Sequence, residues 1–400
     1  MPDSPGISGL TTAVLLQDEY DITIVSREFP GELKDGYASP WAGAHWRSRA
    51  ELEDIRQQGI ALKLLLNYIP VIFVNSSIVS KGFDRETFIH FWNFACTRPS
   101  ETGVMIVDGF DYWDELPLGW NDPWFKDLCP EYRHLTKDEL PTNVEFGIKY
   151  KTVTINPLKH ISYLLACFYA LGGTTELITL SHIQEAIFDN TDIVINCSGL
   201  GSRTLGGVQD QDVYPASGQT VLVQLPIGHV NWRFSRYVAT SAIGTSEIYN
   251  YVIPRDNGEV FLGATYNANF NILNMDLSHI DLISLIVSHP SSTIPDAKIA
   301  DRIIERCLST RPDLLPEGET KLNIKRHGVG LRPVRENGIR IEAEWILSEK
   351  TGKKILLCHN YGHGGYGWQS SYGASLHVIQ TLKQALREGQ EQISNIGVKL

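Results

Sequence analysis

The residue types and spacing best suited to chemistry lie in residues 359–374. Four of these positions, 362, 364, 365 and 367, are glycine, so a flat ligand can approach the bare backbone amide and carbonyl groups closely. Between or just after these glycines stand His363, Tyr366, Trp368 and Gln369. An ordinary glycine-rich surface turn has no need of such side chains. The pattern therefore predicts a ligand-binding loop.

The segments on either side of this loop must position it. Residues 355–358 are apolar and predict a buried strand, and residues 372–382 have the apolar spacing of a helix. A strand that passes through a glycine-rich loop into a helix directs N–H groups and the positive helix end at one point in space. We therefore expect an electron-rich ligand there.

The N-terminal region resembles the second half of a dinucleotide-binding loop. Gly6 and Gly9 lie three positions apart, at the start of a run of small and apolar residues that predicts a helix. Residues 21–28 then predict a strand whose polar end, Ser26 and Arg27, would meet the adenosine ribose. A strand should also precede Gly6, but residues 1–4 include Pro2, which cannot donate to a sheet. We expect either a gap in the sheet or a chain that begins too late.

The remaining chain predicts two interleaved modules. Residues 36–46 form a second loop of small residues, 156–171 a helix and 176–180 a strand. Residues 192–201 predict a buried strand that enters another glycine loop, as in a parallel nucleotide-binding sheet. Residues 214–223 and 249–266 are rich in β-branched and aromatic types, which predicts a separate antiparallel sheet.

Composition excludes several classes of function. The net charge of -11 and the pI near 5.6 argue against nucleic-acid or anionic-membrane partners, which need basic surfaces. The 6 cysteines are scattered without metal-ligand spacing, and the 12 histidines include no HExxH motif, so no metal is expected. The apolar runs are too short to cross a bilayer, and the chain shows no signal peptide. The final Val398-Lys399-Leu400 is close to a peroxisomal address.

Taken together, the motifs resemble those of the D-amino-acid oxidase family, its fungal members most of all. The motifs lie at 37–44, 196–201, 218–223, 251–255, 262–266 and 329–333, and the last accompanies the 359–374 loop. The resemblance implies an α/β fold in which an FAD-binding, Rossmann-like parallel-sheet domain is interleaved with a mostly antiparallel-sheet substrate domain. The FAD-binding domain would comprise approximately 1–50, 150–215 and 325–400, and the substrate domain 51–149 and 216–324.

The resemblance also implies an activity. FAD would take a hydride from a D-amino acid to give the imino acid, and O2 would then be reduced to hydrogen peroxide. The imino acid would hydrolyse to a 2-oxo acid and ammonia. If the amine binds in its neutral form, orientation and electrostatics suffice and no general base is needed. A homodimer is an open expectation.

The resemblance assigns site residues as well. Arg332 would grip the substrate carboxylate bidentately, with help from Tyr251 and Tyr266. The Gly365 carbonyl would receive the amine, and Gln369 would lie near flavin and substrate. The residues expected to bind the cofactor are Gly6, Ile7, Ser8, Gly9, Ser26, Arg27, Ala38, Ser39, Ala42, Gly43, Ala44, Leu180, Cys197, Ser198, Gly362, His363, Gly364, Gly365, Gly367, Trp368 and Gln369.

Some features depart from the family pattern and leave alternatives open. Ser217 stands where the family usually has arginine, and residues 272–295 form a longer segment. A D-aspartate or D-glutamate oxidase would need a second cation, which Arg233, Arg236 or His45 could supply, although Tyr266 favours neutral substrates. A truncated, inactive family member is a further alternative. A nicotinamide-dependent dehydrogenase would leave the 359–374 loop unexplained.

Overall fold

The computed structural model describes residues 5–29, 37–48, 76–237, 247–267 and 294–397. Residues 1–4, almost all of the 272–295 segment and the final 398–400 lie outside the described residues. The expectations that rest on those segments, including the peroxisomal address, stay predictions.

The larger sheet has eight strands in the order β11-β7-β10-β9-β8-β2-β4-β3. The strands are β2 (Val104–Trp113), β3 (Arg133–His134), β4 (Phe146–Ile155), β7 (Val213–Gln224), β8 (Trp232–Tyr237), β9 (Glu247–Pro254), β10 (Glu259–Tyr266) and β11 (Ile324–Arg335). Neighbouring strands run antiparallel except for β2 and β8, which run parallel. The prediction of a mostly antiparallel sheet is confirmed.

The remaining strands form a parallel region in two parts. β1 (Thr23–Ser26) pairs in parallel with β5 (Thr174–Leu177). β6 (Ile193–Asn196) pairs in parallel with β13 (Lys354–His359), and β12 (Ala343–Leu347) adds an antiparallel edge to β13. No strand formed by the described residues joins β1 to β6.

Six α-helices and several short 3-10 helices complete the described chain. The α-helices are α1 (Ile7–Leu16), α3 (Ser76–Thr97), α4 (Pro99–Thr102), α5 (Pro157–Ala170), α7 (Ala297–Thr310) and α8 (Gly367–Gly397). The 3-10 helices are η1 (Ser39–Trp41), η2 (Trp124–Asp127), η3 (Lys137–Glu139), η4 (Ile183–Ala186), η5 (Gly199–Arg203) and η8 (Pro312–Leu314). The start of α5 is set locally, because the Asn156 side chain accepts a hydrogen bond from the Lys159 amide and Pro157 takes the first helical position.

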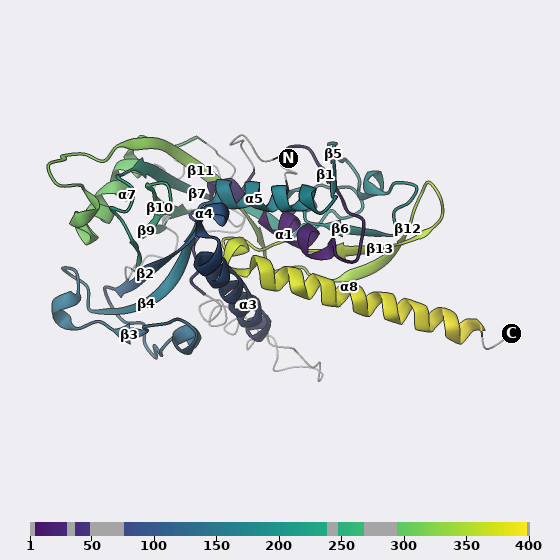
Figure 1. Cartoon of the computed structure of the whole chain (residues 1–400), viewed down its shortest axis with the longest axis horizontal. Helices are drawn as coiled ribbons and strands as arrows, with labels where there is room; N and C mark the ends of the chain where they lie inside the picture. The colour runs from purple at the N-terminus through teal and green to yellow at the C-terminus, as the bar shows by residue number, and fades with distance from the viewer. Residues whose placement is uncertain (1–4, 30–36, 49–75, 238–246, 268–293, 398–400) are drawn as a thin grey trace, which may run out of the picture.

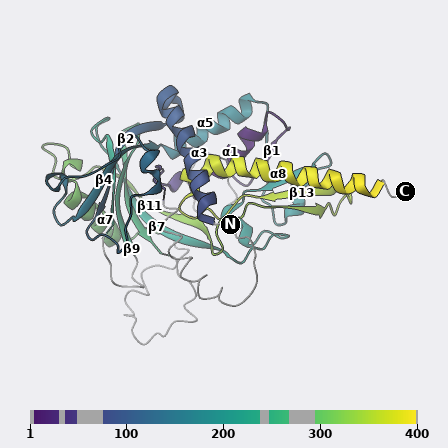
Figure 2. The same ribbon diagram turned by 90° about the horizontal axis from the view of Figure 1, so that it is seen from below.

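The two sheet regions lie toward opposite ends of the long axis, and α8 begins between them (Figure 1). Turned by 90°, the molecule shows the same order, with α3 crossing α8 near its start (Figure 2). The crossing is close, since a β-carbon on Gly373 of α8 would lie 2.8 Å from the carbonyl carbon of Phe83 on α3. The Gly373 amide also donates to Thr87 Oγ1 at 3.0 Å. Backbone contact between α3 and α8 thus fixes where α8 starts.

The expected domain boundaries fall inside continuous strands of the larger sheet. β4, β7 and β11 run across the expected domain boundaries near residues 150, 216 and 325. One apolar core lies between α7 and the strands β7, β9 and β10, and another contains residues of α1, α3, β2, β4 and α5. The division into two domains remains a prediction.

Candidate functional site

A cavity of about 740 Å³ is lined by residues of α1, α8, β7 and β11. Ligand sites in proteins commonly measure about 300–1,000 Å³. Segments spread between Gly6 and His377 therefore meet around one space large enough for a sizeable organic ligand.

The N-terminal end of α1 opens onto this cavity. Gly6, Ile7, Ser8 and Gly9 all line it, and the N-cap residue Gly6 has no side chain that could cap the helix. The Ile7 amide donates to Ser39 Oγ at 3.1 Å, so the 37–44 loop is tied to the helix start. A β-carbon on Gly9 would lie 3.4 Å from the Cys197 β-carbon, which leaves little room for a larger side chain. The first-turn amides and the helix dipole suit an anionic group such as a phosphate.

A second helix begins at the same cavity. α8 starts at Gly367, five residues earlier than the apolar spacing predicted, so half of the 359–374 loop is the first turns of a helix. Gly362 and Gly364 have φ angles of 87° and 56°, a left-handed conformation that favours glycine. Trp368 Nε1 donates to Ser39 O at 3.1 Å and links this helix start to the 37–44 loop. Two positive helix ends therefore face one cavity.

Arg332 stands on β11 with its guanidinium group over the backbone of Gly218 on β7. A β-carbon on Gly218 would lie only 2.6 Å from Arg332 Cζ, so glycine is needed there. Arg332 Nη1 donates to Thr265 O at 3.4 Å, and Cζ lies 5.4 Å from the ring centroid of Tyr266. Arg332 forms no ion pair with a carboxylate of the described residues. Its charge can therefore serve an anionic ligand.

Three tyrosines line the same cavity as the arginine. Tyr251 and Tyr266 both line the cavity, and the Tyr251 ring lies parallel to that of Phe261, with 6.3 Å between centroids. Tyr214 lines it as well. Burial raises the pKa of Tyr214 to about 12, and the neighbouring Tyr266 and Glu336 add to the effect. Tyr214 is therefore a neutral phenol at pH 7.

Gly365 provides a hydrogen-bond acceptor next to Arg332, and Gln369 provides another in the same cavity. A β-carbon on Gly365 would lie 3.4 Å from Arg332 Cδ, so the Gly365 backbone is beside the arginine side chain. Neither the Gly365 carbonyl oxygen nor Gln369 Oε1 makes a hydrogen bond with a described residue. Both residues line the cavity, which therefore contains a cation and two acceptors that no described residue uses.

His363 contributes no charge. Its Nε2 lies 2.8 Å from Asn360 Oδ1, while Asn360 Nδ2 donates to Thr12 Oγ1 at 3.2 Å. Because the Asn360 oxygen faces the ring, Nε2 carries the imidazole hydrogen. Burial lowers the pKa of His363 to about 4. The neutral ring thus connects the start of α8 to α1 without adding a charge to the cavity.

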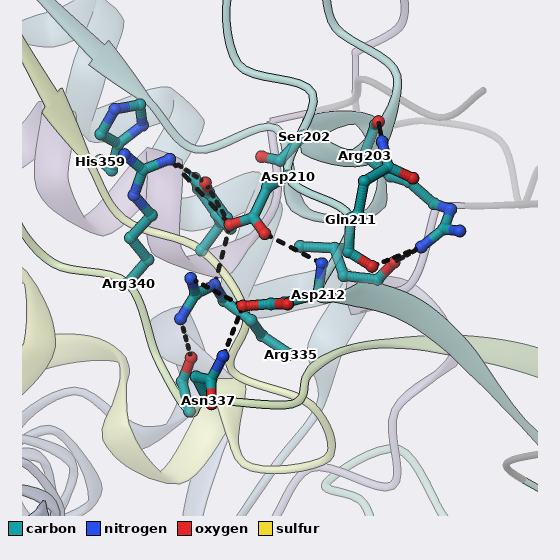
Figure 3. Close-up of polar contacts among 12 residues, drawn as sticks. Ser202, Arg203, Asp210, Gln211, Asp212, Arg335, Asn337, Arg340 and His359 are labelled. Carbon is teal, nitrogen blue, oxygen red and sulfur yellow. Dashed lines mark hydrogen bonds and ion pairs between the residues drawn. The ribbon is translucent and has the colours of Figure 1, made fainter. Parts of the chain in front are cut away.

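A charged network fixes the segment that follows β11 to the cavity wall (Figure 3). Arg335 Nε donates to Asp210 Oδ2 at 2.8 Å, and Tyr361 Oη donates to the same oxygen at 2.8 Å. Arg340 Nη1 donates to Tyr361 Oη at 2.7 Å. Burial alone would raise the pKa of Asp210, but the bonds from Arg335 and Tyr361 outweigh it and lower the pKa below its usual value. Arg335 lines the cavity, yet Asp210 compensates its charge.

The cavity brings together the five residues expected to be catalytic, Arg332, Tyr251, Tyr266, Gly365 and Gln369. It also collects most of those expected to bind the cofactor, namely Gly6, Ile7, Ser8, Gly9, Ala38, Ser39, Ala42, Gly43, Ala44, Cys197, Ser198, Gly362, His363, Gly364, Gly365, Gly367, Trp368 and Gln369. Their location is a structural fact, and their roles remain predictions.

Three residues expected to bind the cofactor do not line the cavity: Ser26, Arg27 and Leu180. Ser26 Oγ donates to Glu28 O at 2.8 Å, and Arg27 forms an ion pair with Glu28 at 3.8 Å. Leu180 packs against an apolar cluster beside β6 and β13. The end of β1 therefore lies away from the cavity.

The expectation that Arg233 or Arg236 could supply a second cation to the cavity is wrong. Arg233 is fully buried and pairs with Asp111 at 2.9 Å, while Arg236 pairs with Asp114 at 2.6 Å. Both arginines lie on β8, several strands away from β7 and β11. His45 does line the cavity.

Tyr214 and Asp84 are among the cavity residues that sequence reasoning missed. A signal existed for Tyr214, because positions 214, 216, 218 and 220 share one face of β7, the face on which Gly218 meets Arg332. No signal existed for Asp84, which lies in the helical pattern of α3, where an acidic residue is usually solvated. Its place in the cavity wall depends on how α3 packs against α8.

Neither a metal site nor a membrane-spanning helix is found among the described residues. These residues contain no group of three or more His, Cys, Asp or Glu side chains that could hold a metal ion. The described part of the chain forms no helix with the length and apolar character needed to cross a membrane.

Comparison with known proteins adds independent findings. The family model described as FAD dependent oxidoreductase (DAO) matches residues 6–381. The chain is 28% identical to the D-amino-acid oxidase of Fusarium vanettenii over 404 residues, covering 97% of both proteins. It is also 28% identical to the D-aspartate oxidase of Cryptococcus neoformans var. grubii, covering 96% of both. Among solved structures, glycine oxidase from Bacillus cereus has the same fold, with a TM-score of 0.63 and 16% identity over 96% of both chains.

The cavity suits FAD on structural grounds. The uncapped first turn of α1 offers amides for the diphosphate, and the lining reaches without interruption to the glycine-rich start of α8, which would follow the flavin. The family model matches residues 6–381, a range that contains every residue lining the cavity. The chain therefore belongs to the DAO family of FAD dependent oxidoreductases, and FAD is its cofactor.

Proposed function

We propose that this protein oxidises D-amino acids with neutral side chains to imino acids, with O2 as the final electron acceptor. One observation carries the proposal: Arg332, which pairs with no carboxylate of the described residues, lies beside the Gly365 backbone, and Gln369 adds a second unused acceptor to the same cavity. The similarity to the Fusarium vanettenii D-amino-acid oxidase along 97% of the chain supports the same activity.

The pair of an arginine and two acceptors matches the two ends of an α-amino acid. The planar guanidinium of Arg332 binds a carboxylate through two parallel hydrogen bonds, which also fixes the plane of that carboxylate. The Gly365 carbonyl and Gln369 Oε1 accept hydrogen bonds from the amine. A substrate held at both ends has a defined position for its α-carbon, and such orientation is a large part of catalysis.

The surrounding side chains complete this arrangement. Tyr251 and Tyr266 line the same cavity, where their hydroxyl groups can donate to the carboxylate. FAD, when bound, accepts the α-hydrogen as hydride and passes two electrons to O2, which gives hydrogen peroxide. The positive ends of α1 and α8 favour negative charge along the cofactor. The released imino acid hydrolyses in water to a 2-oxo acid and ammonia.

The charges in the cavity wall favour neutral side chains. Apart from Arg332, the arginines and lysines of the described residues that line it are Arg47 and Arg335. Arg47 pairs with Asp111 at 2.9 Å, and Arg335 pairs with Asp210 at 2.8 Å. A side-chain carboxylate of D-aspartate would have to compete with these partners. The similarity to a D-aspartate oxidase keeps that substrate as the alternative to be tested.

The test is a peroxide-release screen over D- and L-amino acids, run together with an absorbance spectrum of the purified protein. We expect a flavin spectrum and peroxide from D-alanine or D-methionine in amounts equal to the 2-oxo acid formed. Faster turnover of D-aspartate would refute the neutral-substrate part. A flavin-loaded protein that oxidises no D-amino acid would refute the function itself.

A further inference from the structure

Asp84 of α3 is a buried carboxylate in the wall of the cavity, and no motif pointed to it. Its side chain is only 3% exposed. Asp84 Oδ2 accepts a hydrogen bond of 2.9 Å from Nε2 of Gln369, which lies in the first turn of α8. The backbone of Asp84 is held too, because its carbonyl oxygen accepts a 2.8 Å hydrogen bond from Trp46 Nε1.

This contact decides which way the Gln369 amide faces. An ionised carboxylate can only accept hydrogen bonds, so the amide must turn its NH2 group toward Asp84. The oxygen of the same amide then points the other way. Gln369 is 8% exposed and lines the cavity, and its Oε1 makes no hydrogen bond with a described residue.

We propose that Asp84 is a positioning residue that keeps Gln369 Oε1 turned toward the substrate as an acceptor for its amine. This inference rests on the proposed function. Gly365 lies two residues before α8 and Gln369 lies in its first turn, and both residues line the cavity. Asp84 thereby helps the cavity to select a ligand that carries an amine next to its carboxylate.

The substitution Asp84→Asn tests the orientation with little change in shape. An asparagine can either accept from or donate to Gln369, so the amide is free to turn its NH2 group toward the substrate. The NH2 group of Gln369 and the substrate amine, both hydrogen-bond donors, would then face each other. We expect kcat/KM for D-alanine to fall by about tenfold to a hundredfold, mainly through KM, since one hydrogen bond is lost and a repulsive contact is added.

Three comparisons separate positioning from a structural role. Propionate, which is alanine without the amine, should bind to the Asp84→Asn protein with unchanged Kd, measured by the shift of the flavin absorbance. The melting temperature and bound FAD per chain should stay as in the unsubstituted protein. In a Gln369→Leu background, Asp84→Asn should cause no additional loss, because Asp84 acts through Gln369. Asp84→Glu, which keeps an acceptor-only group, should lose less than Asp84→Asn.

Each other outcome overturns the proposal. An unchanged kcat/KM in Asp84→Asn would show that the amide needs no orienting partner. Weaker propionate binding, loss of FAD or additive losses in the double variant would show that Asp84 supports the fold. If the unsubstituted protein oxidises no D-amino acid, the proposed function fails first, and the role of Asp84 fails with it.

Discussion

The substitution Gly218→Ala should displace Arg332, the arginine proposed to bind the substrate carboxylate, without altering it. The guanidinium group of Arg332 lies directly over the Gly218 backbone, and the new β-carbon would be 2.6 Å from Arg332 Cζ. Unbonded carbon atoms approach to about 3.5–4.0 Å at best, so the guanidinium must move by roughly 1 Å. A displacement of that size at a positioning group costs about a hundredfold in rate.

The expected result is a fall of about a hundredfold in kcat/KM for D-alanine, equivalent to about 2.7 kcal/mol. Peroxide release measures the turnover, and flavin absorbance with the melting temperature confirms that the variant is folded and loaded. Gly82→Ala is the matched control, because a β-carbon at Gly82 on α3 meets no atom within 4 Å. It should behave like the unsubstituted protein.

A Gly218→Ala protein with kcat/KM within about threefold of normal would refute the reasoning, since so small a change corresponds to only about 0.7 kcal/mol. It would mean either that the guanidinium tolerates the shift or that Arg332 is not the anchor. A low melting temperature together with low activity would instead point to damage in the β7–β11 pairing.

Three further predictions follow from the same geometry. Arg332→Leu should lower kcat/KM by about a hundredfold or more, since two charge-assisted hydrogen bonds worth roughly 3 kcal/mol in total are lost, and FAD should stay bound; equal kcat/KM values for this variant and the unsubstituted protein would exclude Arg332 as the anchor. Gly9→Val should weaken FAD binding, because the Gly9 β-carbon position is already 3.4 Å from that of Cys197; unchanged FAD affinity in a dialysis titration would contradict this. Burial holds the pKa of His160 and of His363 at about 4, so these rings are neutral in the fold but take up protons near pH 6.5 when unfolded. Stability to urea should therefore be complete above about pH 6.5 and fall toward pH 4, by up to about 3 kcal/mol for each ring, and His160→Phe should flatten that fall.

The cavity wall shows why some site residues could be predicted from the sequence. Gly6, Gly9 and the 362–367 glycines mark places where the backbone itself meets the ligand, and only glycine permits such an approach, so the requirement is visible in the residue types. Arg332 could be predicted because it belongs to a short motif. Strand alternation on β7 would have added Tyr214.

Other residues could not be found in this way. The arginines at 47, 233 and 335 look alike in sequence, and only their carboxylate partners, which are 64, 122 and 125 residues away, decide whether each charge is compensated. The β2 and β4 strands likewise carry no motif that marks them as part of the large sheet. Their pairing depends on partners more than 30 residues apart.

The sequence by itself determined the family, the cofactor and the local glycine geometry, because these depend on residue type and on spacing along the chain. The tertiary structure alone decided which charges remain available and which way the Gln369 amide faces. That orientation depends on Asp84, 285 residues away on α3, and on the close crossing that brings α3 against α8. Packing of α3 against α8 brings these two hydrogen-bond partners together, and their spacing along the sequence does not indicate that they meet. The proposed selectivity of the site therefore depends on the folded arrangement.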